Sequence, residues 1–404
     1  MRSIKESLFT PVRYDCDVLV VGGGFAGIAA AIAAAREGKQ VILADRGFLL
    51  GGLATAGLVT IYLPLCDGMG HQVSFGLAEA LLRLSVSECC DGQRGVNDWL
   101  HSDDKKRRGP TSPRFDANFN PQLFAILAEQ ELISLGVKLF YGIFAVAVNK
   151  VNGRIREVVF EGKSGRFSIS ARTIVDATGD ADIAHFAEAP TVRFGQGNVL
   201  AAWYYSNSGD KNYQLHMLGF SDTPDEEQAK GQPTPSRLVE RRFSGLDDEE
   251  NSEMCILSHA AILRDLQSKW EAAPDMEPVT LATIPQLRMT RRIVGEYTLS
   301  SEEMHKRFDD SIGMVSDWRK RGPIYEVPFR TLYSKSVRNL ITAGRCTSVT
   351  DGMWDVMRVI PCCAVTGEAA GLAAALTDDF AALDITVLQK KLIANSVVLH
   401  ESDL

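Results

Sequence analysis

The stretch VVGGGFAGIAAAIAAAREGKQVILADR, from Val20 to Arg46, has the pattern of a strand, a glycine turn, a helix and a second strand. The run from Asp17 to Val21 is short and rich in β-branched residues, which is typical of a strand buried on both faces. The alanine-rich run from Ala26 to Arg36 predicts a helix that ends at Gly38. Val41 to Ala44 then predicts the second strand, so the stretch forms one βαβ unit of a parallel sheet.

Three glycines between the first strand and the helix, Gly22, Gly24 and Gly27, have the G-x-G-x-x-G spacing. The first makes a tight turn, the second lets the backbone approach a pyrophosphate, and the third lets the helix pack closely on the strand. The helix N-terminus favours a phosphate. Asp45 lies ~20 residues later, where an adenosine ribose needs an acceptor for its hydroxyls. The pattern therefore predicts dinucleotide binding.

Composition and charge limit the class of protein. The 404 residues suggest two domains, and 45% apolar with 23% charged residues is typical of a globular chain. The net charge of −8 argues against a nucleic-acid partner. The uncharged run from Val18 to Ala35 is long enough to span a membrane, but its glycines and alanines make it weakly apolar. With no signal peptide in evidence, we expect a cytoplasmic protein without a membrane partner.

The cysteines and histidines show no metal-binding spacing. None of the eight cysteines forms a C-x-x-C motif, and none of the seven histidines has a metal-ligand spacing such as H-E-x-x-H, so we expect no metal. The neighbouring pairs Cys89-Cys90 and Cys362-Cys363 would form strained disulfides, which favours free thiols. The basic run from Lys105 to Arg108 is interpreted as a solvated loop.

The connection after the strand Val137 to Tyr141 decides between dinucleotides. A nicotinamide dehydrogenase normally crosses to the next parallel strand through a helix. Here three short strands, with a hairpin turn at Asn152-Gly153, precede a buried strand from Thr173 to Asp176. We expect them to form an antiparallel β-meander crossover. The three expected strands are Ala145–Val151, Arg154–Phe160 and Arg166–Ala171.

This combination resembles the FAD-binding fold of the glutathione-reductase type. The resemblance implies that the turn Ala177-Thr178-Gly179 closes over the ADP half of FAD. The segment Asn339 to Arg345 is similar to the last parallel strand of that fold, whose end passes beside the ribityl chain. Many relatives end that strand in Gly-Asp, whereas this chain has Gly344-Arg345. The usual carboxylate contact to ribitol is therefore in doubt, while backbone contacts remain.

Over nearly its whole length, apart from the polar stretch around 221–250, the chain resembles the FAD-dependent oxidoreductases. This resemblance implies the cofactor and the fold but no particular substrate. No second G-x-G-x-x-G follows a strand, which argues against a built-in NAD(P)H domain. The motifs that carry the resemblance are GGLATAGLVT (Gly51 to Thr60), IPQLRMTRRIVGEYTL (Ile284 to Leu299), YEVPFRTL (Tyr325 to Leu332) and AGRCTSVTDGMWDVMRVIPCC (Ala343 to Cys363).

The expected architecture is an α/β fold in which a parallel, Rossmann-like FAD-binding domain (1–184 and 333–404) carries a smaller α+β substrate domain (185–332). The spacing and the resemblance together give a set of expected FAD-binding residues. They are Gly22, Gly24, Phe25, Ala26, Gly27, Asp45, Arg46, Gly51, Gly52, Ala54, Thr55, Ala145, Ala177, Thr178, Gly179, Gly344, Arg345, Arg358, Val359 and Ile360.

In the substrate domain, the run from Ser221 to Arg237 predicts an exposed loop, and Asp248 to Trp270 predicts a helix. Near the C-terminus a helix of small residues runs through Leu376, with Gly367 and Gly371 expected to pack closely against the sheet. The side of the 248–270 helix expected to be apolar carries Ile256, Leu257, Ala260, Leu263 and Leu266.

Four residues are candidates for catalysis. Arg358 precedes the C-terminal helix and either stabilises negative charge on the reduced cofactor or forms a structural ion pair. Arg288 and Arg292, four residues apart, share a face on either a helix or a strand, which suits a carboxylate or pairing with protein acids. Cys66 is a cofactor-facing thiol, a covalent tether or, the favoured reading, an inert buried side chain.

The sequence predicts an enzyme that passes a hydride between a small organic substrate and non-covalently bound FAD. The substrate is anionic if no protein acids neutralise the arginines. The alternatives are a flavoprotein electron-transfer subunit that needs a partner protein, and FAD in a non-redox role. The substrate, the electron acceptor and any homo-oligomer are left open.

Overall fold

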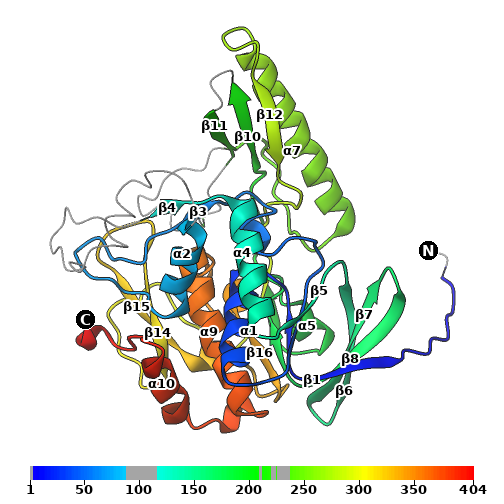
Figure 1. The fold of residues 1–404 in the computed structure, drawn as a ribbon, viewed down its shortest axis with the longest axis vertical. Helices are drawn as coiled ribbons and strands as arrows, with labels where there is room; N and C mark the ends of the chain where they lie inside the picture. Colours follow the sequence, from blue (N-terminus) through cyan, green and yellow to red (C-terminus); the bar gives the residue numbers. More distant parts are fainter. Residues whose placement is uncertain (1–2, 88–115, 209–211, 220–223, 225–236) are drawn as a thin grey trace.

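The computed structural model describes residues 3–87, 116–208, 212–219, 224 and 237–404 (Figure 1). The basic run at 105–108, Cys89-Cys90 and nearly all of the loop expected at 221–237 lie outside the described residues.

A mixed sheet with a parallel centre organises the fold, which confirms the expected α/β class. The parallel strands are β5 (Lys138–Phe140), β2 (Val41–Ala44), β1 (Val12–Val21), β8 (Gly165–Asp176) and β16 (Leu340–Thr342). From one edge inward, the parallel strands lie in the order β5, β2, β1, β8, and β16 also pairs with β8. Val18 of β1 lies opposite Val41 of β2 on one side and opposite Thr173 of β8 on the other. β2, β16 and the last four residues of both β1 and β8 are buried on both faces, as is typical of parallel strands.

Three consecutive antiparallel strands connect β5 to the parallel centre of the sheet. β6 (Phe144–Val151) pairs with β7 (Arg154–Gly162), and β7 pairs with β8. The expectation of two separate strands, at 166–171 and 173–176, was wrong, because β8 is continuous. Its first half pairs with β7 and its last residues pair with β16, while β1 pairs with its other edge from Ser168 to Asp176.

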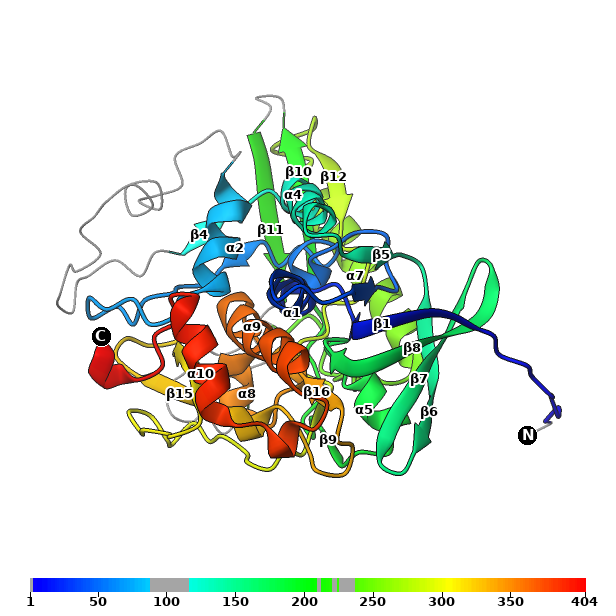
Figure 2. The ribbon, with the colours of Figure 1, turned by 60° about the horizontal axis from the view of Figure 1, so that its bottom comes forward.

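Two apolar helices, α1 (Phe25–Arg36) and α9 (Ile360–Leu376), lie side by side against the sheet (Figures 1 and 2). A Cβ added to Gly367 or Gly371 would lie 2.3 Å and 2.1 Å from backbone oxygens of α1. The expectation that these glycines pack on the sheet was therefore wrong: they allow the two helices to approach each other.

No single described helix is long and apolar enough to cross a membrane. The pair α8 (Asp351–Met357) and α9 meets the length and composition criteria together, but it is bent by 89° at the break. Most residues of both helices are buried inside the protein, as core helices are.

A second, smaller sheet with one long helix projects from this body (Figure 1, top). The strand order is β11 (Asn212–Leu218), β10 (Ala202–Ser208), β12 (Glu277–Leu281), and α7 (Asp248–Lys269) packs on β10. Ala202 and Tyr204 of β10 share a small core with helix residues.

The helix α7 forms where it was expected, but Leu266 is the one fully buried residue among the five expected on its apolar side. Its buried residues are Met254, Ala261, Ile262 and Leu266, whereas Ile256 and Leu263 are 67% and 50% exposed. Each residue adds about 100° around a helix. The centre of the buried face therefore lies about half a turn away from the centre of the predicted face. Contact with β10, and not helical periodicity alone, selects the face.

Shorter elements make up the rest of the described fold. β14 packs on α9 and on the C-terminal helix α10, and forms a hairpin with β15. The proposed division at residues 185 and 332 stays a prediction. The remaining elements of the described residues are β3 (Ile61–Tyr62), α2 (Leu77–Val86), β4 (Ala117–Asn118), α4 (Pro121–Ser134), α5 (Asp182–Phe186), β9 (Thr191–Arg193), β13 (Arg291–Ile293), β14 (Ser311–Ser316), β15 (Ile324–Pro328), α10 (Ile385–Ala394) and five short 3-10 turns.

Candidate functional site

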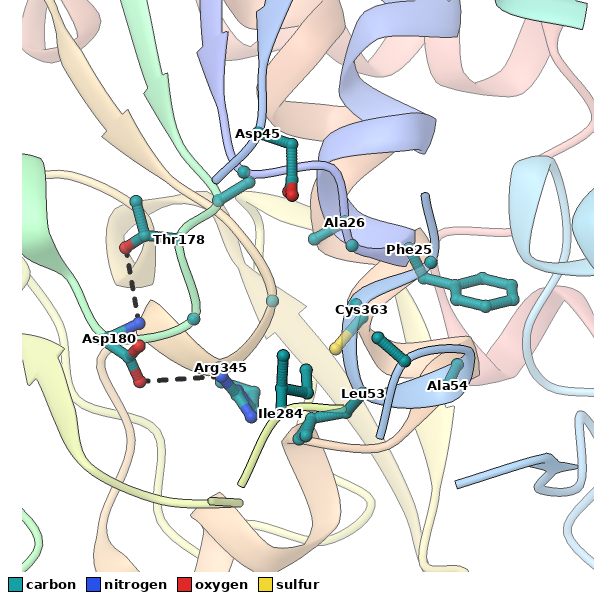
Figure 3. Close-up of a pocket in the computed structure, with 18 of the residues that line it drawn as sticks. Phe25, Ala26, Asp45, Leu53, Ala54, Thr178, Asp180, Ile284, Arg345 and Cys363 are labelled. Carbon is teal, nitrogen blue, oxygen red and sulfur yellow. Dashed lines mark hydrogen bonds and ion pairs between the residues drawn. The ribbon is translucent and has the colours of Figure 1, made fainter. Parts of the chain in front are cut away.

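A first cavity opens at the carboxyl ends of β1, β2, β8 and β16, where ligands bind in parallel α/β sheets (Figure 3). The turns that follow these four strands supply most of its wall. Residues 284–287 and the start of α9 close it. We call it the first cavity.

The glycine turn after β1 shapes one side of the first cavity. Gly22 has φ +104°, and a Cβ there would lie 2.3 Å from the Ala177 carbonyl oxygen. A Cβ on Gly27 would lie 1.8 Å from the Gly22 oxygen, so only glycine allows α1 to start here. At Gly24 a Cβ would meet nothing within 4 Å, because this residue faces the open cavity.

The first turn of α1 offers backbone amides at this wall. Its N-cap, Gly24, has no side chain to cap the helix, and the first turn carries no acidic residue. The positive end of the helix dipole is therefore uncompensated by a side chain, which suits a phosphate. Phe25 points away from the cavity in Figure 3 and stacks on Phe124 with ring centroids 4.3 Å apart, which anchors the turn.

Asp45 directly follows β2 at the rim of the first cavity. One carboxylate oxygen accepts the Gly23 N–H at 2.5 Å and the other accepts the Gly47 N–H at 2.6 Å. These two bonds fix the carboxylate in place. Each oxygen has a further lone pair for a ligand hydroxyl.

An ion pair links the ends of the neighbouring strands β8 and β16. Nη2 of Arg345 lies 3.6 Å from Oδ1 of Asp180, and the Thr290 hydroxyl donates to that same oxygen at 2.7 Å (Figure 3). The guanidinium lies directly on Gly179, where a Cβ would be 2.1 Å from Nη2. Arg46 approaches the other oxygen of Asp180 at 3.8 Å from the exposed rim. Both Asp180 and Arg345 line the cavity.

A second cavity of about 320 Å³ adjoins the first. Leu53, Ala54, Arg345, Arg358 and Ile360 line both, so they form a shared wall. Ile360 begins α9, whose N-terminus lacks a side-chain cap and carries no acidic residue in its first turn. The N-terminus of α9 is therefore close to both cavities.

Arginines and apolar side chains line the second cavity. Arg288, Arg319, Arg345 and Arg358 are in its wall, and no acidic residue is among the described residues that line it. The side chains of Arg319 and Arg358 are only 1% and 7% exposed. The rest of the wall is apolar, with the indoles of Trp203 and Trp318 and aliphatic side chains from residues 53–63.

Two buried carboxylates behind this wall hold two of the arginines. Nη2 of Arg358 donates to Oδ1 of Asp355 at 2.6 Å and its Nε donates to the same oxygen at 2.9 Å. Arg319 donates to both oxygens of Asp317, at 3.0 and 2.9 Å, and lies 3.5 Å from Oδ2 of Asp355. The ion-pair alternative considered for Arg358 is therefore present, and Arg358 also lines both cavities.

Most of the expected FAD-binding residues come together around the first cavity. Val359, which was expected to bind FAD, and Arg288, a candidate for catalysis, line the second cavity instead. The expected residues in the wall of the first are Gly22, Gly24, Phe25, Ala26, Asp45, Arg46, Gly51, Gly52, Ala54, Ala177, Thr178, Gly179, Gly344, Arg345, Arg358 and Ile360.

Five expected site residues line neither cavity. One is Gly27, which lies behind the wall against the Gly22 carbonyl. The Thr55 hydroxyl donates to the Leu50 carbonyl at 2.5 Å and braces the loop after β2 from inside. Ala145 lies in β6, opposite Phe160. Cys66 is buried, 3% exposed, and its backbone pairs with Gln72 in an isolated antiparallel β-bridge. Arg292 lies 3.5 Å from Asp351, over the Trp354 ring.

Sequence reasoning missed Asp180, Cys363 and both indoles of the second cavity. Asp180 directly follows the Ala177-Thr178-Gly179 turn, a signal that was available. Cys363 lies one turn into α9, and burial raises the pKa of its thiol to about 11. The tryptophans come from 203 and 318, and nothing in their local sequence indicates a cavity.

The first cavity fits an adenine dinucleotide: a cradle without Cβ atoms, an uncapped helix N-terminus for phosphate and a fixed carboxylate for a ribose. Within the described ranges, no group of three or more His, Cys, Asp or Glu side chains is arranged to hold a metal ion.

Comparison with known proteins agrees with this chemistry. The family model described as FAD dependent oxidoreductase matches residues 17–201 and 244–392. A thioredoxin reductase of Ureaplasma parvum is 35% identical over 71 residues, which are 18% of this chain and 23% of that protein. The sarcosine oxidase subunit alpha of Rhizobium meliloti is 50% identical over 46 residues, which are 11% and 5%. The matched segments thus span less than a quarter of either relative.

Among solved structures, a geranylgeranyl bacteriochlorophyll reductase-like protein of Thermoplasma acidophilum is similar over 95% of this chain and 84% of its own. The identity is 14% and the TM-score is 0.47.

Proposed function

The chain belongs to the family of FAD-dependent oxidoreductases, and from that premise we propose that it binds FAD non-covalently in the first cavity and oxidises or reduces a small organic anion held in the second. The observation that carries the proposal is the wall that the two cavities share, formed by Leu53, Ala54, Arg345, Arg358 and Ile360. A ligand in the second cavity would lie against a cofactor in the first.

In this proposal the residues of the first cavity divide the dinucleotide between them. The N-terminal amides of α1 and the turn at Gly22 and Gly24 hold the pyrophosphate, and Asp45 accepts hydrogen bonds from the adenosine ribose. Asp180 supplies a carboxylate on the β8 side. Bound FAD would supply the hydride acceptor or donor, which no side chain of this chain supplies.

The chain itself orients the substrate and stabilises charge. Arg358 and the N-terminus of α9 place positive potential at the shared wall, where negative charge that develops during the reaction is stabilised. The described wall of the second cavity has no Asp, Glu, His, Lys or Tyr. We therefore propose that a proton lost or gained by the substrate is exchanged with water and not with a side chain of this wall.

The test begins with the purified protein. It should be yellow, and acid precipitation should release FAD into the supernatant; colour retained in the pellet would contradict non-covalent binding. Organic acids are then added anaerobically, and bleaching of the flavin absorbance identifies a reductant. A colourless protein that binds NAD would refute the proposal.

A flavoprotein subunit that exchanges electrons with a partner protein is the alternative, and a relative that is named as a subunit, sarcosine oxidase subunit alpha, favours it. The same anaerobic experiment separates the two, because a partner-dependent subunit bleaches only when its protein partner is added. We also propose a cytoplasmic location, as the sequence leads us to expect.

A further inference from the structure

The second cavity is apolar almost throughout. Every residue that lines it but not the first cavity is apolar, apart from Arg288 and Arg319. Val59, Ile61 and Leu63 lie on one segment of this wall. A hydrophilic ligand would lose hydration against these side chains without regaining hydrogen bonds, which is unfavourable.

The two indoles of this cavity are fixed in orientation by the protein. Nε1 of Trp203 donates to the Gly219 carbonyl at 3.1 Å, and Nε1 of Trp318 donates to the Asp355 carbonyl at 2.8 Å. Since both indole N–H groups are used inside the protein, the rings offer a ligand only carbon surface. This arrangement suits an apolar body and does not suit a second polar group.

Each indole also carries an arginine on its face. Cζ of Arg288 lies 4.9 Å from the ring centroid of Trp203, and Cζ of Arg358 lies 5.6 Å from that of Trp318. A guanidinium whose face is covered by a ring presents its edge of N–H donors, which is the geometry that a carboxylate accepts. In Arg358 the Nε and Nη2 donors of that edge already bind Asp355. Arginine also keeps its charge when buried.

The charges favour one anionic group. No acid is among the described residues of the wall, and Arg345 and Arg358 lie on the side shared with the first cavity. Acids outside this wall pair with three of its four arginines: Asp317 with Arg319, Asp355 with Arg358 and Asp180 with Arg345. These three arginines therefore do not meet the condition, set from the sequence, of having no neutralising acid. A single anion can be placed at the arginines, whereas a second one would lie against the apolar wall.

The size of the cavity sets the size of the ligand. Its volume of about 320 Å³ is roughly twice that of the ~150 Å³ apolar cavity that takes benzene. We propose that the second cavity binds a hydrophobic monoanion, an organic acid whose single charged group meets the arginines and whose apolar body is of about two rings. This rests on the proposed function, because it names the substrate class of the same site.

The test compares three probes on the FAD-loaded protein by calorimetry at pH 7.5. The probes are 2-naphthoate, its neutral isostere 2-naphthamide, and succinate, which has two charges and no apolar body. We expect 2-naphthoate to bind ~10-fold or more tightly than the amide, since a charge-assisted hydrogen bond contributes that much, and ~10-fold or more tightly than succinate. Equal binding of acid and amide, or succinate binding as tightly as 2-naphthoate, would overturn the proposal.

Matched variants locate the binding. Arg288→Met should weaken 2-naphthoate ~10-fold or more, whereas Arg307→Met, at an exposed arginine outside both cavities, should not. Trp203→Leu should weaken 2-naphthoate as well, and Trp270→Leu, directly after α7 and outside both cavities, should not. If the cavity variants bind as the wild type does, the proposal fails. If a variant does not fold, the probe comparison above, which needs no variant, decides.

The outcome also separates this inference from the proposed function. If 2-naphthoate binds but leaves the flavin spectrum unchanged, the second cavity takes hydrophobic acids away from the cofactor, and the proposed function fails alone. If a small hydrophilic acid bleaches the flavin and 2-naphthoate does not bind, the proposed function stands and this inference fails.

Discussion

Glu368 gives the sharpest quantitative test of the core that holds both cavities. It lies in α9, 2% exposed, with one carboxylate oxygen accepting the Leu77 N–H at 2.6 Å and the other 3.3 Å from Nδ2 of Asn395. Burial raises the pKa of its carboxyl from 4.5 to about 7, because desolvation disfavours the ionised form.

The sign of the effect follows from linkage. When the pKa of a carboxyl is higher in the folded state than in the unfolded state, ionisation of that carboxyl destabilises the folded state. The free energy of unfolding should therefore fall as the pH rises from the unfolded pKa of 4.5 through about 7, and then level off. A shift of ~2.5 units at ~1.36 kcal/mol per unit amounts to roughly 3 kcal/mol.

The perturbation is Glu368→Gln, which keeps the acceptor for Leu77 and removes the titration. At pH 5 the variant and the wild type should be nearly equal in stability, and at pH 8 the variant should be more stable by roughly 3 kcal/mol. With an unfolding entropy of ~2.1 cal/mol/K per residue over 404 residues, that corresponds to ~4 °C in Tm.

The assay is the Tm of both proteins at the two pH values, with saturating FAD throughout. The difference between the two proteins cancels the other titrating groups, and Glu302→Gln, at an exposed glutamate, serves as the control. A variant whose Tm differs from the wild type by the same amount at pH 5 and pH 8 would show that Glu368 does not titrate in this range, and the reasoning would be refuted.

Three further predictions concern the two cavities. Asp45→Ala should weaken FAD by roughly one to two decades, because charge-assisted hydrogen bonds of ~1.5–3 kcal/mol are lost; titration of the FAD-free protein measures it, and an unchanged Kd would assign the ribose to another residue. Gly27→Ala should prevent stable folding or FAD retention, since its Cβ would lie 1.8 Å from a carbonyl oxygen, whereas Gly24→Ala, with open space at its Cβ, should keep its Tm without FAD and lose affinity for FAD. Asp355→Asn should lower the free energy of unfolding by ~3–5 kcal/mol, because it removes a buried carboxylate that neutralises Arg319 and Arg358. An unchanged Tm would show that these ion pairs do not stabilise the protein.

The parts of the site that were predictable are those set by local backbone geometry. The spacing of Gly22, Gly24 and Gly27 specifies a turn and a helix start whatever the rest of the chain does, and Asp45 follows from the length of one helix and one strand. These constraints act over fewer than thirty residues. They can therefore be recognised within one short segment of the sequence.

The second cavity was not predictable in this way, because its wall is assembled from distant segments. Trp203, Trp318 and Arg358 come together because β10, the loop between β14 and β15, and the junction of α8 and α9 pack together. The helix α7 makes the same point: its periodicity predicted a helix correctly, but Ile256 and Leu263 face solvent since β10 selects the other side. Which face of an element is covered depends on tertiary contacts, and an apolar pattern alone leaves it undetermined.

Arg345 shows why a motif should not be compared with its relatives at a single position alone. Where Gly-Asp is usual at the end of the last parallel strand, this chain has an arginine, and the carboxylate contact was in doubt. A carboxylate nevertheless reaches the first cavity from the neighbouring strand, because Asp180 follows β8 and β16 pairs with β8. Its ion pair with Arg345 holds both groups at the cavity. When two strand ends lie side by side, a carboxylate can reach the same cavity from either end. Motifs at such ends should therefore be compared together and not one position at a time.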